Sequence, residues 1–79
     1  MSNTFSDALK VLKDGGKVCR SGWNGKGMSV QLYFVVGMPP MLVLKKGGEI
    51  LSTWVPSMSD VLSEDWAQVH DGRVNNNSL

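Results

Sequence analysis

The chain has 79 residues, and its formal charge of +1 at pH 7 reflects a near balance of eight Lys and Arg against seven Asp and Glu. Its hydrophobic share of 42% and charged share of 19% exclude a disordered chain, and its length predicts a single domain, residues 1–79. Because duplex-binding modules carry a clear basic excess, the near-neutral charge disfavours duplex nucleic acid as a partner.

The first predicted element is an amphipathic helix near the N-terminus. Thr4 is a suitable N-cap, and Asp7 three residues later completes the pattern of a capping box. Gly15 and Gly16 end the helix, because glycine adopts positive φ angles without steric cost. The apolar side chains recur at intervals of three and four residues and form one face: Phe5, Ala8, Leu9 and Leu12.

Short strands are predicted after the helix, at residues 17–20, 28–34, 41–46, 49–55 and 65–69. The second of these is the clearest, because apolar and polar residues alternate along its whole length. Between the third and fourth strands, Gly47 and Gly48 predict a two-residue hairpin turn, so these two strands are expected to pair antiparallel.

A second, short helix is predicted at residues 58–62, before the last strand. Its signal is a capping box, with Ser57 as the N-cap and Asp60 three residues later. The expected fold class is therefore α+β, with an N-terminal helix packed on an antiparallel sheet of about four or five strands. Residues 4–70 are expected to be ordered, and residues 71–79 to be frayed.

The sequence contains one His and one Cys, which argues against a metal site and against catalysis. His70 and Cys19 cannot supply the four ligands of a structural zinc site. His70 lies near the C-terminus without a nearby nucleophile, and Asp71 beside it points away if the segment is extended. A cysteine in a strand is more often a small buried hydrophobic residue than a reactive thiol. We therefore expect no catalytic residues and no metal.

The expected location is the cytoplasm, because no apolar run approaches the roughly 20 residues needed to span a bilayer and the N-terminus lacks the layout of a signal peptide. A chain this short has a thin core, and with one cysteine it cannot form an intrachain disulfide. Association into a homo-oligomer is therefore the expected source of additional stability.

The segment SGWNGKGM, residues 21–28, places Trp23 in a predicted loop that is rich in glycine and carries Lys26. Such a segment either anchors a turn to the domain or forms the floor of a ligand site. Glycine exposes backbone N–H groups that can bind phosphate, but on spacing alone a turn with a solvated lysine is better supported. Trp66 is expected in the core, whereas packing and base stacking remain open for Trp23 and Trp54.

Two segments resemble the signature segments of a family of small phage and bacterial proteins: SGWNGKGM and, at residues 54–66, WVPSMSDVLSEDW. The N-terminal TFSDALKVLKDGGKVCR is similar to the opening helix and strand of the same family. The resemblance extends from residue 4 to about residue 69. The family includes the second type of Thoeris anti-defence protein.

This resemblance implies a non-enzymatic protein that sequesters an immune signal. Such proteins bind the cyclic ADP-ribose isomer made by a TIR-domain immune enzyme, such as glycocyclic ADP-ribose, and some also bind cyclic dinucleotides. The resemblance further implies a homo-oligomer, typically a tetramer built as a dimer of dimers, with ligand pockets at protomer interfaces and no metal or cofactor. The expected source is a phage or prophage, and the expected location is the cytoplasm of its bacterial host.

The chemistry of such a ligand suggests roles for the residues of both segments. An adenine ring, riboses and a pyrophosphate require a stacking surface, hydrogen bonds to sugar and an anion contact. In this interpretation Trp23 stacks on the adenine, Phe5 adds a second apolar wall, and Lys26 or Arg20 neutralises charge. The residues expected at the ligand site are Phe5, Arg20, Trp23, Asn24, Gly25, Lys26, Gly27, Met28, Trp54, Ser57 and Asp60.

Some of these residues have a second interpretation. Asn24 and the backbone of residues 25–27 suit ribose and phosphate oxygens. Ser57 and Asp60 can hold ribose hydroxyls, although their role as a helix cap is at least as well supported. The alternative function is a single-stranded nucleic-acid or general interaction module that uses the same tryptophans. A small enzyme acting on nucleotides is disfavoured by the lack of an acid–base pair.

Overall fold

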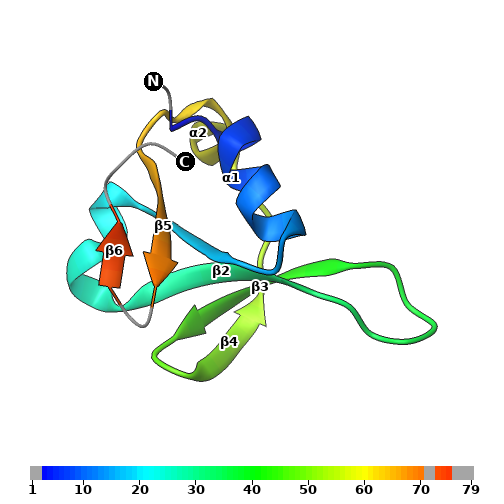
Figure 1. Cartoon of the computed structure of the whole chain (residues 1–79). Helices are drawn as coiled ribbons and strands as arrows, with labels where there is room; N and C mark the ends of the chain where they lie inside the picture. The colour runs from blue at the N-terminus through cyan, green and yellow to red at the C-terminus, as the bar shows by residue number, and fades with distance from the viewer. Residues whose placement is uncertain (1–2, 71–72, 76–79) are drawn as a thin grey trace.

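One antiparallel sheet carries two α-helices on the same side (Figure 1). The elements of this computed structural model are α1 (Phe5–Lys13), β1 (Lys17–Arg20), the 3-10 helix η1 (Ser21–Lys26), β2 (Met28–Tyr33), β3 (Met41–Lys46), β4 (Glu49–Thr53), α2 (Met58–Leu62), β5 (Trp66–His70) and β6 (Arg73–Asn75). The structure describes residues 3–70 and 73–75. Its strand order is β4-β3-β2-β1-β5-β6. The predicted fold class, α+β with an N-terminal helix and a short helix before β5, is confirmed.

Helix α1 begins where its capping box predicts. The Thr4 hydroxyl accepts a hydrogen bond from the Asp7 amide at 3.2 Å, and the Thr4 amide donates to the Asp7 carboxylate at 3.1 Å. Gly15 follows the helix with a φ of +89°, a conformation that glycine adopts without strain. Gly16 leaves no room for a side chain, because a Cβ there would lie 2.6 Å from Cγ1 of Val11. The two glycines therefore turn the chain directly into β1.

The apolar face of α1 packs on the sheet and forms the core with it. Trp66, the first residue of β5, is fully buried and is the largest side chain there. Cys19 is also buried, and this burial, together with the negative charge of Asp65, raises the pKa of its thiol. Cys19 is therefore a small buried residue, as predicted, and not a reactive thiolate. The buried residues that form the main cluster of the core are Ala8, Leu12, Val18, Val30 and Trp66.

Strand β1 lies in the middle of the sheet although it comes first in the sequence. It pairs antiparallel with β2 on one side and with β5 on the other. The register places Val18 opposite Val30 and Arg20 opposite Trp66. Because β1 leads directly into η1, this register brings the first signature segment to the start of β5, where the second signature segment ends.

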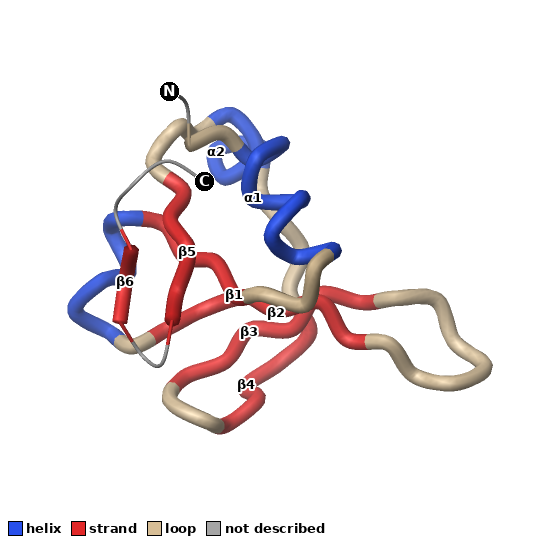
Figure 2. The backbone as a smooth tube through the Cα atoms, viewed as in Figure 1, coloured by secondary structure: helices blue, strands red, loops and turns tan. Residues whose placement is uncertain are grey.

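Strands β2 and β3 pair along their whole length, and the loop between them extends away from the rest of the molecule (Figure 2). Strand β2 ends at Tyr33 and β4 ends at Thr53, one and two residues before the predicted ends. The side chains beyond these ends, Phe34 and Val55, are 67% and 84% exposed. These two side chains therefore pack little against the rest of the chain.

Two segments differ from the prediction. Residues 21–26, expected to form a glycine-rich loop, form η1, which ends at Gly27 with a φ of +64°. Short 3-10 helices are common connectors with too few residues to show a periodic pattern, so the sequence did not reveal this one. Strand β6, residues 73–75, pairs with β5 beyond the last predicted strand. The rest of the tail, residues 71–72 and 76–79, lies outside the described residues.

Candidate functional site

The two signature segments meet at a cluster of three tryptophans. Trp23 comes from η1, Trp54 from the connection between β4 and α2, and Trp66 from the start of β5. Their ring centroids lie 5.7 or 6.0 Å apart, and each pair is edge to face, with interplanar angles of 82° or 83°. Because such aromatic pairs contribute about 0.5–1.5 kcal/mol each beyond the area that they bury, the cluster stabilises the contact between the two segments.

The three rings differ in burial. Trp66 is fully buried, and its indole N–H donates a hydrogen bond to the Asp60 carbonyl at 3.0 Å. Phe5 of α1 packs against Trp66, with ring centroids 5.4 Å apart. Trp23 and Trp54 are only partly buried, so each residue keeps some surface in contact with solvent. Trp66 therefore belongs to the core, as predicted, while Trp23 and Trp54 pack against it and keep exposed surface.

Arg20, at the junction of β1 and η1, bridges two carboxylates. Its Nε lies 3.0 Å from Oδ1 of Asp65, and its Nη1 lies 3.0 Å from Oδ1 of Asp60. The side chains of Arg20 and Asp60 are 24% and 15% exposed, so the pair is shielded from solvent more than a surface ion pair. Two negative charges already outweigh the single positive charge of this guanidinium, one of the two groups predicted to neutralise a ligand phosphate.

The same contacts hold these groups in their charged forms. Partial burial opposes ionisation of Asp65, but hydrogen bonds from Arg20 and Ser21 outweigh this effect and lower the pKa of its carboxyl group. Burial likewise opposes ionisation of Asp60, whose pKa is nevertheless lowered by hydrogen bonds from Ser57 and Arg20. The hydrogen bonds to Asp65 and then to Asp60 raise the pKa of Arg20. The cluster is therefore fully ionised at neutral pH.

Ser57 and Asp60 form the predicted capping box of α2. The Ser57 amide and hydroxyl both donate to Oδ2 of Asp60 at 2.9 Å, and the Asp60 amide donates back to the Ser57 hydroxyl at 3.2 Å. With Oδ1 bound to Arg20, both carboxylate oxygens of Asp60 accept hydrogen bonds within the protein. A ribose hydroxyl could donate to this carboxylate only at an oxygen that already accepts a hydrogen bond from Arg20 or Ser57.

The helical form of η1 changes what its backbone can offer to an anion. In a 3-10 helix N–H groups donate to carbonyls three residues earlier, and the Ser21 amide at the start of η1 donates instead to the Asp65 carbonyl at 3.1 Å. The carbonyl of Gly27 accepts a hydrogen bond from the Gly47 amide at 3.2 Å, which joins the end of η1 to the β3–β4 turn. Met28 then begins β2 and is partly buried. The side chains of residues 24–26, Asn24 and Lys26 among them, lie outside the described residues.

Neither a metal centre nor a membrane-spanning helix is found in the described part of the chain. Across residues 3–70 and 73–75, no three His, Cys, Asp or Glu side chains are grouped so that they could hold a metal ion. Over the same residues, no helix has the length and apolar character needed to cross a membrane. The side chain of His70, considered above as an acid–base group, lies outside the described residues.

Asp65 is a residue of the site that the sequence did not reveal. It bridges the segments through three contacts, with the guanidinium of Arg20, the hydroxyl of Ser21 at 2.9 Å and the amide of Ser21 at 3.1 Å. The register of β1 against β5, which sets Arg20 opposite Trp66, produces these contacts. The sequence offers only a weak signal for them, an acidic residue just before one strand and a basic residue at the end of another.

Comparison with known proteins gives two matches that cover most of the chain. Residues 3–69 match the family model Tad2-like, which is described as a Thoeris anti-defense 2-like domain. Over 80 aligned residues, the chain is 38% identical to a protein of Bacillus phage SP01 named Thoeris anti-defense 2. This alignment covers 80% of the chain and 90% of the phage protein. The residues matched by the family model include the two segments that meet at the tryptophan cluster.

Proposed function

The chain belongs to the Tad2-like family of Thoeris anti-defence proteins, and on this premise we propose that it binds and sequesters cyclic nucleotide immune signals. The proposed ligands are cyclic ADP-ribose isomers, such as glycocyclic ADP-ribose, and cyclic dinucleotides. The protein holds the signal without degrading it, so its anti-defence effect comes from removing the signal from its receptor. The proposed place of action is the cytoplasm of a bacterium that carries the phage or prophage.

The observation that carries this proposal is the position of Trp23. Its ring is fixed by edge-to-face contacts with Trp54 and Trp66, yet it is only partly buried. A flat ring that is held in place and still exposed in part is suited to stack on a nucleobase, because little side-chain entropy is lost on binding. Base–aromatic stacking contributes about 1–3 kcal/mol per base in single-stranded nucleic-acid complexes.

The pyrophosphate contact is proposed for Lys26. The Ser21 amide of η1 donates to the Asp65 carbonyl, and Arg20 is paired with two carboxylates. Lys26 is the remaining basic residue of the first signature segment. A charge-assisted hydrogen bond from its ammonium group to phosphate would supply affinity that neither of these groups can provide.

A homo-oligomer, a tetramer built as a dimer of dimers, is proposed as the functional form. The protomer leaves large apolar side chains exposed in the β2–β3 loop, on strand β4 and around α2. Such exposed apolar patches on a small domain mark interaction surfaces. The side chains concerned are Phe34, Val35, Val36, Met38, Ile50, Leu51, Val55, Met58, Val61 and Leu62.

Release of bound ligand by heating tests the proposal. The purified protein is incubated with glycocyclic ADP-ribose, with other cyclic ADP-ribose isomers and with cyclic dinucleotides, then separated from unbound compound and heated. The released compounds are identified by mass spectrometry. Recovery of an intact compound supports sequestration. A chemically changed product would instead indicate an enzyme, and uptake of none of these compounds would overturn the proposal.

Two variants make the assay specific for the tryptophan cluster. Trp23→Ala is expected to lose uptake of the compound that the unchanged protein retains. Tyr33→Ala is the matched control, because Tyr33 follows the core-facing Leu32 in β2 and so lies on the opposite face of the sheet. A labelled single-stranded oligonucleotide tests the alternative function. Its binding would weaken steeply as salt is raised, whereas an enclosed small ligand depends on salt less.

A further inference from the structure

The guanidinium of Arg20 connects parts of the chain that are far apart in the sequence. Its two hydrogen-bond partners, Asp60 and Asp65, are 40 and 45 residues away. Each carboxylate is in turn held by a second group, Asp60 by Ser57 and Asp65 by Ser21. These five side chains form one continuous network that joins the start of η1, the first turn of α2 and the start of β5.

The three segments that this network joins also carry the three tryptophans. Trp23 lies within η1, Trp54 comes shortly before α2, and Trp66 begins β5. The carbonyl of Asp60 accepts the indole N–H of Trp66, so the polar network and the aromatic cluster share a residue. A shift of η1 relative to α2 or β5 would therefore disturb both at once.

The charges in the network argue against direct contact between Arg20 and an anionic ligand. One positive guanidinium faces two carboxylates whose pKa values are held low, so the group carries a net negative charge at neutral pH. A pyrophosphate brought to this point would meet more repulsion than attraction. Any effect of Arg20 on ligand binding must then be indirect, through the positions of other residues of the protein.

We propose that Arg20 is a positioning residue for the nucleotide site, which holds η1 against α2 and β5 and so fixes Trp23 relative to Trp54 and Trp66. The two contacts use different nitrogens of one planar group, which a lysine cannot reproduce because its ammonium is a single point of charge. This inference rests on the proposed function only where it concerns the binding of ligand at Trp23. The placement of the rings can be measured in the free protein.

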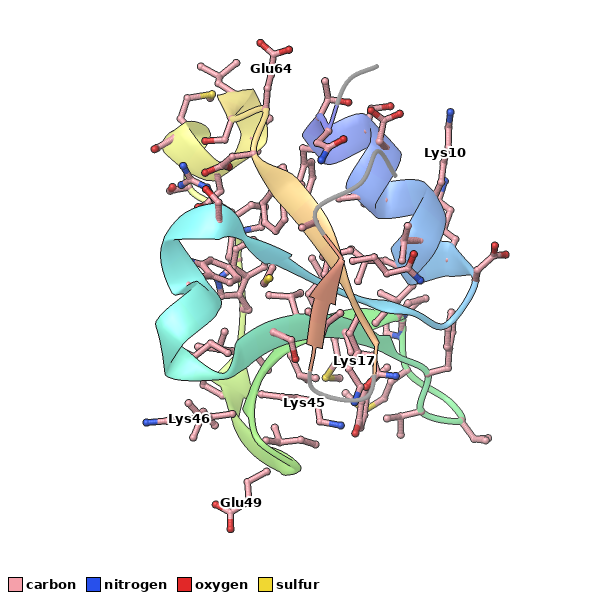
Figure 3. All side chains as sticks on the ribbon, turned by 60° about the vertical axis from the view of Figure 1, so that its left-hand side comes forward. Lys10, Lys17, Lys45, Lys46, Glu49 and Glu64 are labelled. Atoms are coloured by element: carbon pink, nitrogen blue, oxygen red, sulfur yellow. The ribbon has the colours of Figure 1, made fainter. Side chains whose placement is uncertain are left out.

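Near-ultraviolet circular dichroism of the free protein provides that measurement, because the bands of closely spaced tryptophans depend on their mutual orientation. We expect Arg20→Gln and, to a smaller degree, Arg20→Lys to reduce these bands. The far-ultraviolet spectrum of both variants should remain that of a folded protein. Lys45→Gln is the control for loss of one positive charge. Figure 3 shows Glu64, the neighbour of Asp65, at the top of the molecule and Lys45 well below it, in the lower half.

Titration with glycocyclic ADP-ribose separates positioning from direct contact. If Arg20 acts through the rings, Arg20→Gln and Asp65→Asn each weaken binding by roughly tenfold to a hundredfold, and the double variant is no weaker than the worse single variant. If Arg20 contacted the phosphate itself, Arg20→Gln would weaken binding with unchanged tryptophan bands. Asp65→Asn, which removes a competing negative charge, would then strengthen binding.

The spectra of the free protein bear on the inference without depending on the proposed function. Wild-type tryptophan bands in a folded Arg20→Gln protein would overturn it, whether or not any nucleotide binds. Should Arg20→Gln fail to fold, Asp65→Asn is decisive, since it removes one of the two ion pairs and keeps the other, and unchanged bands in that variant would overturn the inference as well. If the unchanged protein binds no cyclic nucleotide, the proposed function fails while the spectra still decide the role of Arg20.

Discussion

The indole N–H of Trp66 donates to the backbone carbonyl of Asp60 at 3.0 Å, and through this bond the fully buried ring of β5 holds the short helix α2 in place. Asp60 thereby acts with both its backbone and its side chain, since its carboxylate also caps the helix and pairs with Arg20. A helix of five residues has little stability of its own, so these tertiary contacts are what keep it folded.

Substitution of Trp66 by Phe should lower the free energy of unfolding by about 2–4 kcal/mol. The smaller ring leaves a cavity in the core, and the Asp60 carbonyl is left with its longer hydrogen bond from the Ser63 amide, at 3.4 Å. Urea unfolding measures the change, with Trp54→Phe as the comparison at a partly buried position. If the two variants lose the same free energy of unfolding, the full burial of Trp66 and its hydrogen bond add no stability beyond that of a partly buried tryptophan.

Trp23→Ala should weaken ligand binding by about 1–3 kcal/mol or more, the range of a lost base–aromatic stack. Because Trp23 also packs on two other rings, a smaller loss of stability is expected, below that of a Trp66 substitution. Calorimetric titration and thermal unfolding give the two quantities separately. A variant that unfolds or changes its oligomeric state would show that Trp23 is mainly an anchor, and a folded variant with unchanged affinity would remove it from the site.

Lys26→Ala should weaken binding of a pyrophosphate ligand by about 1.5–3 kcal/mol, the usual contribution of a hydrogen bond to a charged group. Lys13→Ala, in the last turn of α1, is the matched control for loss of one lysine. The affinities are measured at two salt concentrations, because the contribution of a charge contact should shrink at the higher one. If both variants bind like the unchanged protein, Lys26 does not contact the ligand.

Stability should fall as the solution becomes acidic, because the folded protein lowers the pKa of both Asp60 and Asp65. An unfolded Asp titrates near about 3.9, so the unfolded chain binds more protons in this range and stability rises with pH. The contribution is complete above the unfolded pKa and is lost as pH falls through the lower folded values. Thermal unfolding from pH 7 to pH 3 should show this loss in the unchanged protein and less of it in Arg20→Gln. An identical pH dependence in both would contradict the assignment of the low pKa values to the Arg20 contacts.

Light scattering should show a particle several times heavier than the 8.6 kDa chain. Val36→Glu should reduce this mass if the β2–β3 loop contributes to the interface, since Val36 is fully exposed in the protomer and its substitution removes no internal packing. Lys46→Glu, at an exposed position with a charged residue already in place, is the control. A clean monomer of the unchanged protein at micromolar concentration would rule out a ligand site shared between protomers.

Contacts between near neighbours in the chain were predictable from residue types. Both capping boxes, Thr4 with Asp7 and Ser57 with Asp60, form between residues three apart, and Gly47 takes the positive φ that its hairpin needs. In such cases the chain itself keeps the partners close, so the residues present decide whether the contact forms. Composition and alternation were likewise sufficient to place Trp66 in the core and to identify an α+β fold.

The contacts within the candidate site, and the part played in them by Asp65, were not predictable. Residue patterns and a family resemblance selected Trp23, Trp54 and Arg20, but not the rings that would touch or the carboxylates that Arg20 would meet. Partners 40 and 45 residues away come within reach because β1 inserts between β2 and β5 in one particular register. Strand order and register depend on how the whole sheet packs against α1, a property of the folded chain that no short stretch of sequence contains.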